Sequence, residues 1–338
     1  MNRKRFDIQL ARVKQSMATL RPVSLLTLCA LLVPMTSQAV VGRDLAYPPE
    51  GAPISADEVA RQVYFANHFF AFKNFSIKRR GRTMSVLINS SDGSDLATAV
   101  ERHLNNNYDA DDGEALLSRD LAIFHSGKMR GTGMLVSEYK DENKSKDYMV
   151  WIPELRKVRR FSQPRYEDAW GGSVFTFGDV TLRKPDDETH ELIGKKPFRT
   201  CLGTIESLEG KLYRYSGRLP ERSCRHVNKE VYGLKSTTKF DNWWYDYRIS
   251  YVDTKSFADY RTLYYKNNQL IKVIDRDWGL VNTEEEGDPR ALFWKYWYGL
   301  DLRTGNESWA VIPREVVEYN TSEGNDFWTE KTLRKIKR

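Results

Sequence analysis

Hydrophobic residues recur with a helical period shortly after the amino-terminal leader of the chain. Apolar positions from Val59 to Phe70 repeat at the three- and four-residue spacing that places side chains on one helix face. Ser55 precedes this run and Glu58 follows three residues later, which is the pattern of a capping box at a helix start. The pattern therefore predicts an amphipathic helix over residues 56–70.

Alternation of apolar and polar residues dominates the rest of the chain and predicts many short strands. The predicted strands cover residues 83–88, 118–125, 129–139, 147–153, 156–161, 211–216, 244–252, 260–266, 269–275, 292–299, 307–312 and 314–320. The Asn267-Asn268 pair between two of them predicts a tight hairpin turn. No repeat or linker interrupts the series, so we expect residues 40–338 to form a single domain around a large antiparallel sheet, curled or closed.

Three polar stretches are expected to connect these strands. Residues 89–115 predict an inserted surface excursion that holds a short helix near Leu96–Leu104. Residues 141–146 predict an exposed hairpin turn, and residues 183–191 predict a loop. With one clear helix and many strands, the expected fold class is mainly β (α+β).

Residues 1–39 have the pattern of a secretory signal peptide. Six basic residues come first, the apolar run Val23–Val33 follows, and Ser37-Gln38-Ala39 supplies small residues at the two positions that signal peptidase reads. The apolar run is shorter than the ~20 residues that a membrane-spanning helix needs. We expect cleavage after Ala39 and export to the periplasm; a retained anchor is the alternative.

The leader also accounts for most of the positive charge of the chain. It holds six of the 53 basic residues and one of the 46 acidic residues, so the net charge of +7 falls to about +2 without it. Proteins that bind nucleic acid usually concentrate basic residues on one face. The near-balanced mature chain therefore argues against a nucleic-acid partner.

Few residues of the mature chain suggest chemistry. Cys201 and Cys224 form an even pair, which favours a disulfide in an oxidising compartment over two free thiols. The five histidines are scattered without metal-ligand spacing, and there is no Gly-x-Ser-x-Gly elbow around a nucleophile. The sequence therefore predicts no catalytic residue, no metal site and no cofactor.

Large side chains alternate between the two faces of strands in the second half of the chain. The alternating sets are Tyr245, Tyr247, Ile249 and Tyr251 in one strand, and Phe293, Lys295 and Trp297 opposite Trp294, Tyr296 and Tyr298 in another. Such rows are typical of the core of a sandwich or barrel. They are also compatible with a cavity for an apolar ligand, because curled sheets of this size enclose space.

Residues 124–180 carry a series of motifs that identifies a family. The motifs are Arg130-Gly131-Thr132-Gly133-Met134-Leu135-Val136, Val150-Trp151-Ile152-Pro153, Leu155-Arg156-Lys157-Val158-Arg159-Arg160-Phe161 and Trp170-Gly171-Gly172-Ser173-Val174-Phe175-Thr176-Phe177-Gly178-Asp179-Val180. The series resembles the outer membrane lipoprotein-sorting protein family, the LolA-like proteins, in which a Gly-Thr-x-x-Leu strand precedes a Trp- and Pro-containing strand and a Gly-Ser-x-Phe-x-x-x-Asp segment. The resemblance implies an incomplete, strongly curved antiparallel β-barrel with helices covering its concave side.

The resemblance also implies a function and candidate residues. It implies a carrier or chaperone that binds acyl chains of a lipid or lipid-modified protein as a monomer, in cooperation with an inner-membrane transporter. The candidate cavity wall consists of Met134, Val136, Val150, Ile152, Phe175 and Phe177. Arg159 and Arg160 could hold a headgroup or form a solvated strand end, and Gly172 and Asp179 are expected to shape a structural loop. An envelope hydrolase or a non-catalytic sensor on the same scaffold is the alternative.

Overall fold

The computed structural model describes residues 42–336 except 92–93, 107–114, 142, 182, 204–223 and 282–286. The predicted signal peptide and the predicted strand at residues 211–216 lie outside the described residues. Residues 40–338 form one compact unit. Within the described ranges, no helix combines the length and the apolar composition that crossing a membrane requires.

The predicted amino-terminal helix is present as α1, Ala56–Asn67. The side chain of Ser55 accepts a hydrogen bond from the backbone N–H of Glu58 at 3.1 Å, as the capping box predicts. The helix ends three residues earlier than expected because Phe69 adopts a left-handed conformation with φ of 56°. This turn places the Phe69 ring on Phe75, with ring centroids 4.2 Å apart. Two shorter helices are α2, Phe177–Val180, and α4, Glu330–Leu333.

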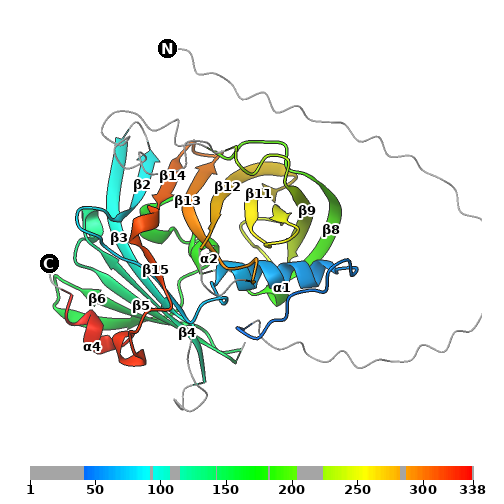
Figure 1. Cartoon of the computed structure of the whole chain (residues 1–338). Helices are drawn as coiled ribbons and strands as arrows, with labels where there is room; N and C mark the ends of the chain where they lie inside the picture. The colour runs from blue at the N-terminus through cyan, green and yellow to red at the C-terminus, as the bar shows by residue number, and fades with distance from the viewer. Residues whose placement is uncertain are drawn as a thin grey trace, which may run out of the picture. The chain divides into compact units, whose positions relative to one another are not determined.

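The described strands pair into one antiparallel sheet of fifteen strands, shown in Figure 1. They are β1 Asn74–Ile77, β2 Ser85–Ser91, β3 Ser94–Asn105, β4 Leu116–Phe124, β5 Gly133–Tyr139, β6 Asp147–Ile152, β7 Lys157–Phe161, β8 Glu188–Pro197, β9 Glu230–Thr238, β10 Tyr247–Asp253, β11 Asp259–Lys266, β12 Gln269–Leu280, β13 Leu292–Asp301, β14 Glu307–Val311 and β15 Val317–Tyr319. Asn267 and Asn268 connect β11 to β12 with φ of 51° and 58°, which confirms the predicted tight turn.

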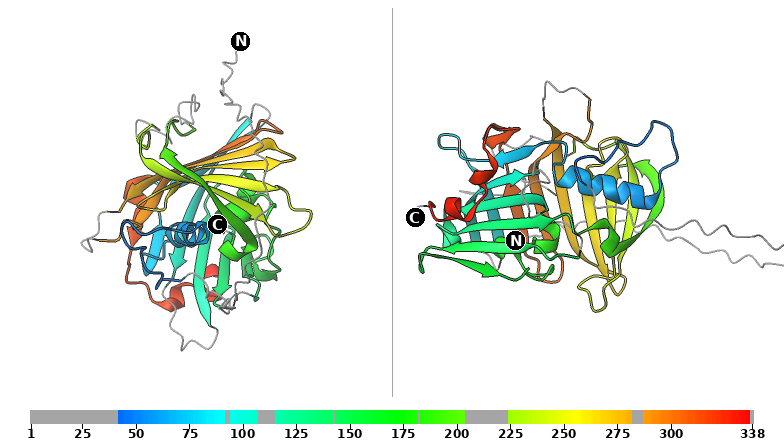
Figure 2. Two further views of the ribbon diagram at one scale, coloured as in Figure 1. Left: turned by 90° about the vertical axis from the view of Figure 1, so that its right-hand side faces the viewer. Right: turned by 90° about the horizontal axis from the view of Figure 1, so that it is seen from below.

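The sheet is built from two meanders that meet at β2 and β14. The strand order is β7-β6-β5-β4-β3-β2-β14-β13-β12-β11-β10-β9-β8, and β1 pairs with both β15 and β3. Among the described strands, β7 and β8 end this order and β15 pairs only with β1, so the sheet is not closed. Figure 2 shows how strongly it curves, with β8–β13 arching over α1 in the left view. A mainly β fold with a large, open antiparallel sheet is therefore confirmed.

Two polar stretches were assigned wrongly from the sequence. The helix expected near Leu96–Leu104 is wrong, because these residues form the central strand β3 between β2 and β4. Its polar side chains are accommodated by pairing across the sheet; Arg102, for example, contacts Asp120 at 2.6 Å. The loop expected at residues 183–191 is wrong from Glu188 onward, where β8 begins. Strands β1 and β9 were not predicted.

The two faces of the sheet carry separate hydrophobic clusters. We call the face that bears Leu87, Val100 and Trp297 the inner face, because the main core cluster lies there. The outer face carries a smaller cluster of Val86, Ile88, Tyr296, Tyr298, Trp309 and Val311. The expected alternation is wrong at Trp294, which joins Trp297 on the inner face with ring centroids 4.7 Å apart. A register shift between Asp277 and Trp278 on the neighbouring strand marks an irregularity in this pairing.

The predicted disulfide between Cys201 and Cys224 is confirmed, with Cα atoms 4.1 Å apart. Residues on both sides of the bridge contact two fully buried carboxylates of β12. Asp277 contacts His226 at 2.7 Å, and Asp275 accepts a hydrogen bond from the backbone N–H of Gly203. The disulfide therefore fixes a segment that is also held to the sheet by buried charge.

Candidate functional site

The connection between the two edge strands crosses the inner face of the sheet. We call residues 164–181 of this connection the cover segment. It turns at Gly171 and Gly172, whose φ values of 59° and 71° lie in the left-handed region that glycine tolerates. It then forms α2, where Thr176 and Asp179 complete a reciprocal capping box. The cover segment thus places a short, locally stabilised helix over the inner face.

An apolar cavity, which we call the apolar chamber, lies between the cover segment and the strands around the β2–β14 junction. Its volume is about 70 Å³. It is lined by Ile77, Ser85, Val86, Leu87, Val100, Arg102, Trp170, Phe175, Val180, Trp294, Trp297, Ala310, Val311 and Ile312. Phe175 meets Trp297 edge to face at 5.5 Å between ring centroids. Arg102 is ion-paired with Asp120, so its charge is already compensated at the chamber wall.

Close packing holds Phe175 against the sheet. Gly299 of β13 lies directly below the cover segment, and a Cβ atom added there would come within 2.8 Å of the Phe175 ring. The added atom would come still closer, within 2.5 Å, to the side chain of Val174. No side chain larger than hydrogen therefore fits at Gly299 without displacing Val174 and Phe175. The glycine thereby permits the close approach that forms one wall of the apolar chamber.

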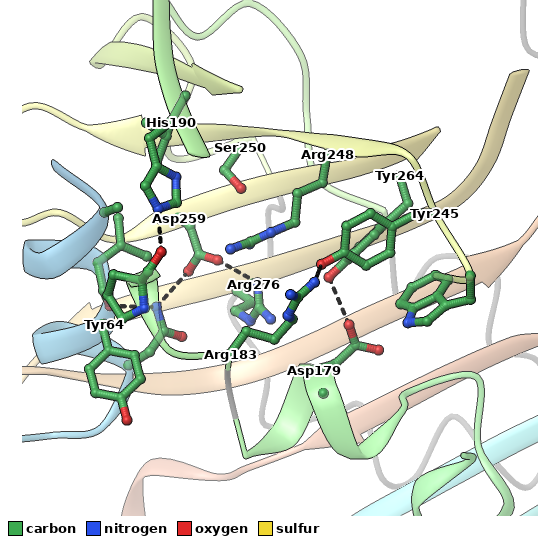
Figure 3. A pocket seen from close by; sticks show the side chains of 17 residues that line it. Tyr64, Asp179, Arg183, His190, Tyr245, Arg248, Ser250, Asp259, Tyr264 and Arg276 are labelled. Carbon is green, nitrogen blue, oxygen red and sulfur yellow. Dashed lines mark hydrogen bonds and ion pairs between the residues drawn. The ribbon is translucent and has the colours of Figure 1, made fainter. Parts of the chain in front are cut away.

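A second cavity, the charged chamber, has a volume of about 40 Å³ and is shown in Figure 3. Its lining consists of Ala60, Val63, Tyr64, Asn67, Gly178, Asp179, Arg183, Pro185, His190, Leu234, Trp244, Tyr245, Arg248, Ser250, Asp259, Tyr264 and Arg276. Figure 3 shows the guanidinium groups of Arg183, Arg248 and Arg276 gathered in its middle. The interior of this half of the sheet is thus strongly polar.

Buried ion pairs organise the charged chamber. Arg276 contacts Asp259 at 2.5 Å, and Arg248 contacts Glu188 at 2.6 Å. Burial works to raise the pKa of Glu188, but the guanidinium of Arg248 outweighs burial and holds the pKa at about 2. Glu188 therefore stays ionised at neutral pH.

Asp179 anchors the cover segment to the sheet. Its carboxylate accepts hydrogen bonds from the Thr176 backbone N–H at 2.8 Å and from the Tyr264 hydroxyl at 2.7 Å, and it pairs with the buried ammonium of Lys272. Burial alone would raise the pKa of Asp179, but Lys272 and these hydrogen bonds lower it below its usual value. The cover segment is thereby tied to β11 and β12 by an ionised, buried carboxylate.

A second buried cluster connects the end of the cover segment to α1. Lys146 donates to the backbone carbonyl of Thr181 at 3.0 Å and pairs with Glu138 of β5 at 3.0 Å. Glu138 also accepts from the Tyr64 hydroxyl at 3.1 Å and lies 3.7 Å from His68. Burial lowers the pKa of His68, so its ring is neutral at neutral pH. Two separate clusters therefore hold the cover segment in place.

The two chambers share a boundary. The guanidinium of Arg276, in the charged chamber, lies 4.2 Å from the ring centroid of Trp297, in the apolar chamber. Asp179 and Val180 are adjacent in α2 and line the charged and the apolar chamber, respectively. The inner face thus offers an apolar compartment directly beside a cationic one.

The structure brings some of the predicted cavity residues to this site. Phe175 lines the apolar chamber, and Phe177 packs on the main core cluster and on Tyr148 at 6.0 Å. Met134 also packs on the main cluster. Val136 is buried in β5 without lining either chamber.

The remaining predicted residues lie elsewhere. Val150 and Ile152 are half-buried in β6 and line neither chamber. Arg159 and Arg160 are exposed on the edge strand β7, also outside both chambers. Gly172 forms the turn of the cover segment. The roles proposed for these residues stay predictions.

The sequence did not point to the arginines of the charged chamber. Arg183 falls in the stretch predicted to be a loop, and Arg248 alternates with tyrosines in a row that is typical of a core. Tyr247 stacks on Tyr265 at 4.9 Å, whereas Arg248 is the residue that lines the chamber. The one available signal was Asp275-Arg276-Asp277, a run of charges inside an otherwise apolar strand.

Two serines contact histidines, which is the contact that a hydrolase needs. The Ser236 hydroxyl lies 2.9 Å from Nδ1 of His190, and the Ser76 hydroxyl lies 2.9 Å from Nδ1 of His103. However, Ser236 and Ser76 are only 0% and 1% exposed, and neither lines a chamber described here. A nucleophile must reach its substrate, so these pairs are arranged as structural contacts. Across the described residues, no three His, Cys, Asp or Glu side chains are placed to hold a metal ion.

Comparison with known proteins places the chain by its fold. A family model described as "Uncharacterized protein" matches residues 117–278. A DUF1329 family protein from Desulfovibrio piger is similar with a TM-score of 0.59 and 14% identity, over 81% of this chain and 97% of that one. An outer membrane lipoprotein-sorting protein domain from Vibrio parahaemolyticus is similar with a TM-score of 0.58 and 12% identity, over 83% of this chain and all of that one. None of the curated proteins matches the sequence.

The comparison confirms the predicted resemblance. The chain has a LolA-like fold, in which a large, open antiparallel sheet is accompanied by few helices. At 12–14% identity, these similarities establish the fold and leave the ligand to be argued from the site.

Proposed function

We propose that the protein is an exported carrier that shields an acyl chain of a lipid or lipid-modified protein from water. The observation that carries this proposal is the apolar chamber, which lies on the inner face of an open sheet beneath the cover segment. The similarity to an outer membrane lipoprotein-sorting protein domain supports the same class of ligand. The signal peptide predicted at residues 1–39 supports a periplasmic location.

The size of the apolar chamber indicates how loading would occur. At about 70 Å³ it is smaller than the ~150 Å³ cavity known to admit benzene, so a long chain enters only if the cover segment moves. Burying about ten methylene groups would contribute ~8 kcal/mol. Breaking one buried ion pair such as Asp179–Lys272 costs about 3–5 kcal/mol. The ligand can therefore offset the loss of that one pair.

Carrier action needs no covalent step. The acyl chain leaves when an acceptor binds it comparably well, so we propose a non-enzymatic role. We further propose that α1 and the cover segment together form the helical cover of the concave side, and that the monomer exchanges its cargo with an inner-membrane transporter. The residues Met134, Val136, Val150, Ile152 and Phe177 remain proposed as wall positions of the opened cavity.

Binding of a fluorescent fatty acid to delipidated protein tests the proposal. Ala310→Phe should fill the apolar chamber, since Ala310 lines it, and should weaken binding by about tenfold or more. Ala97→Phe on the same sheet is the matched control, because Ala97 packs on the outer cluster. Saturable binding that Ala310→Phe abolishes and Ala97→Phe retains supports a carrier. Absence of binding, or equal effects of the two substitutions, contradicts it.

A further inference from the structure

We propose that the charged chamber holds the anionic headgroup, a carboxylate or a phosphate, of an amphiphile whose chain occupies the apolar chamber. This inference rests on the proposed carrier function and specifies its ligand. It assigns the headgroup to Arg276 and Arg183, in place of the exposed pair Arg159 and Arg160.

Two buried arginines of the charged chamber have incomplete hydrogen bonding. Arg183 and Arg276 are 8% and 2% exposed, and both line the charged chamber. Nε of each is buried without a hydrogen-bond partner. A buried donor that lacks an acceptor is costly, and more so when the group is charged. These two donors can therefore serve an acceptor group of a bound ligand.

Positive charge exceeds negative charge in the lining of the charged chamber. Arg276 has Asp259 as its counterion, and Lys272 has Asp179. In contrast, Arg183 and Arg248 share the single carboxylate of Glu188. Among the residues that line the chamber, three arginines face two carboxylates, those of Asp179 and Asp259. An anion therefore suits this lining better than a cation does.

The charged chamber also has the size and position that a headgroup needs. A water molecule needs about 10–15 Å³ of such space, so the ~40 Å³ of the charged chamber suits a group of three or four heavy atoms, such as a carboxylate or a phosphate. Arg276 borders Trp297 of the apolar chamber at 4.2 Å. A headgroup held by Arg276 would therefore direct the attached chain past Trp297 into the apolar chamber. Asp179 and Asp259 also line the charged chamber, but each is already bonded to a cation.

Binding of three amphiphiles with the same chain tests the inference. Hexadecanoate, hexadecyl phosphate and hexadecanol are titrated into delipidated full-length mature protein at neutral pH, with displacement of a fluorescent fatty acid as readout. We expect at least one anion to bind about ten- to a hundredfold more tightly than the alcohol, since hydrogen bonds to charged groups contribute about 1.5–3 kcal/mol. The preferred anion distinguishes a carboxylate from a phosphate source.

Substitutions test which residues cause the preference for an anionic headgroup. Arg276→Gln should reduce the ratio of anion to alcohol affinity to within about threefold of one, while the affinity for hexadecanol stays the same. The double variant Arg276→Gln/Asp259→Asn, which leaves neither charge of the pair, should do the same and guards against misfolding of the single variant. Arg303→Gln is the matched control, because it breaks an exposed arginine–aspartate pair outside both chambers. It should leave the ratio unchanged.

Each other outcome overturns the inference. If hexadecanol binds as tightly as both anions, the headgroup site is wrong and the carrier function stands. If Arg160→Gln abolishes the preference and Arg276→Gln does not, the headgroup lies at the sheet edge instead. If none of the three amphiphiles binds, the carrier function fails, and the inference fails with it.

Discussion

Neutralising Asp179 should weaken the attachment of the cover segment to the sheet. Asp179→Asn keeps the size of the side chain but removes the charge that faces Lys272, whose own side chain is only 2% exposed. The amide also cannot accept from Thr176, Tyr264 and Lys272 as the carboxylate does. Two unit charges about 4 Å apart interact by ~4 kcal/mol at an effective dielectric constant of 20, and breaking a buried pair costs about 3–5 kcal/mol. We expect a loss of unfolding free energy in that range.

Urea denaturation at pH 7, followed by tryptophan fluorescence with the disulfide intact, measures this loss. Asp179→Asn/Lys272→Met removes both charges and should be less destabilising than Asp179→Asn alone, because no unpaired ammonium remains buried. Glu330→Gln, which breaks an exposed pair with Arg334, should cost less than about 1 kcal/mol. The expectation is refuted if Asp179→Asn costs no more than Glu330→Gln, or if the double variant loses the sum of its two single substitutions.

Three further predictions concern the same framework. Gly299→Ala should cost about 1–3 kcal/mol in urea denaturation, because the new Cβ would displace Phe175; an unchanged midpoint would contradict the packing described. Replacing Cys201 and Cys224 by serine should cost about 2–4 kcal/mol, since the bridge closes a loop with a sequence separation of 23; equal stability of reduced and oxidised protein would argue against this. The unfolding free energy should fall as the pH drops below ~6.5, because His68 then binds a proton in the unfolded state, whereas its buried, neutral ring in the folded state resists protonation. His68→Gln should reduce the slope of unfolding free energy against pH by up to ~1.4 kcal/mol per pH unit, and an identical slope would exclude this cause.

The parts of the fold that follow from local rules could be predicted from the sequence. The start of α1 is specified by Ser55 and Glu58, and the β11–β12 hairpin by two asparagines that tolerate positive φ. The disulfide also follows from an even number of cysteines in a mature chain that is predicted to be exported. These features depend on residues that are close in sequence or on the cellular compartment, and the sequence carries signals for both.

Other elements depend on partners that are distant in sequence. Strand β3 is too polar to be predicted alone, but Asp120 compensates its Arg102 across the sheet. Strand β8 begins at a buried Glu188 that is stabilised by Arg248, sixty residues away. An alternating pattern cannot show that an inner position is filled by an ion pair instead of an apolar side chain. The charged chamber consists of such pairs, so it could not be predicted from the sequence.

The same dependence on distant partners explains why the sequence predicted only part of the wall of the apolar chamber. The motif that carries the family resemblance identified Phe175, which does line the apolar chamber. It could not identify Trp294, because the irregular pairing opposite Trp278 brings that ring to the inner face. A break in the register is specified by strand pairing, and a single sequence does not reveal it.

Mass spectrometry of organic extracts from protein purified out of its native compartment tests the central claim most directly. We expect a co-purifying amphiphile with an acyl chain, in an amount that approaches one molecule per protein and that drops sharply in Ala310→Phe. The extract of Ala97→Phe should match that of the unmodified protein. Consistent absence of any such molecule from the unmodified protein, or the same amount in all three extracts, would contradict the claim that this sheet carries a lipid.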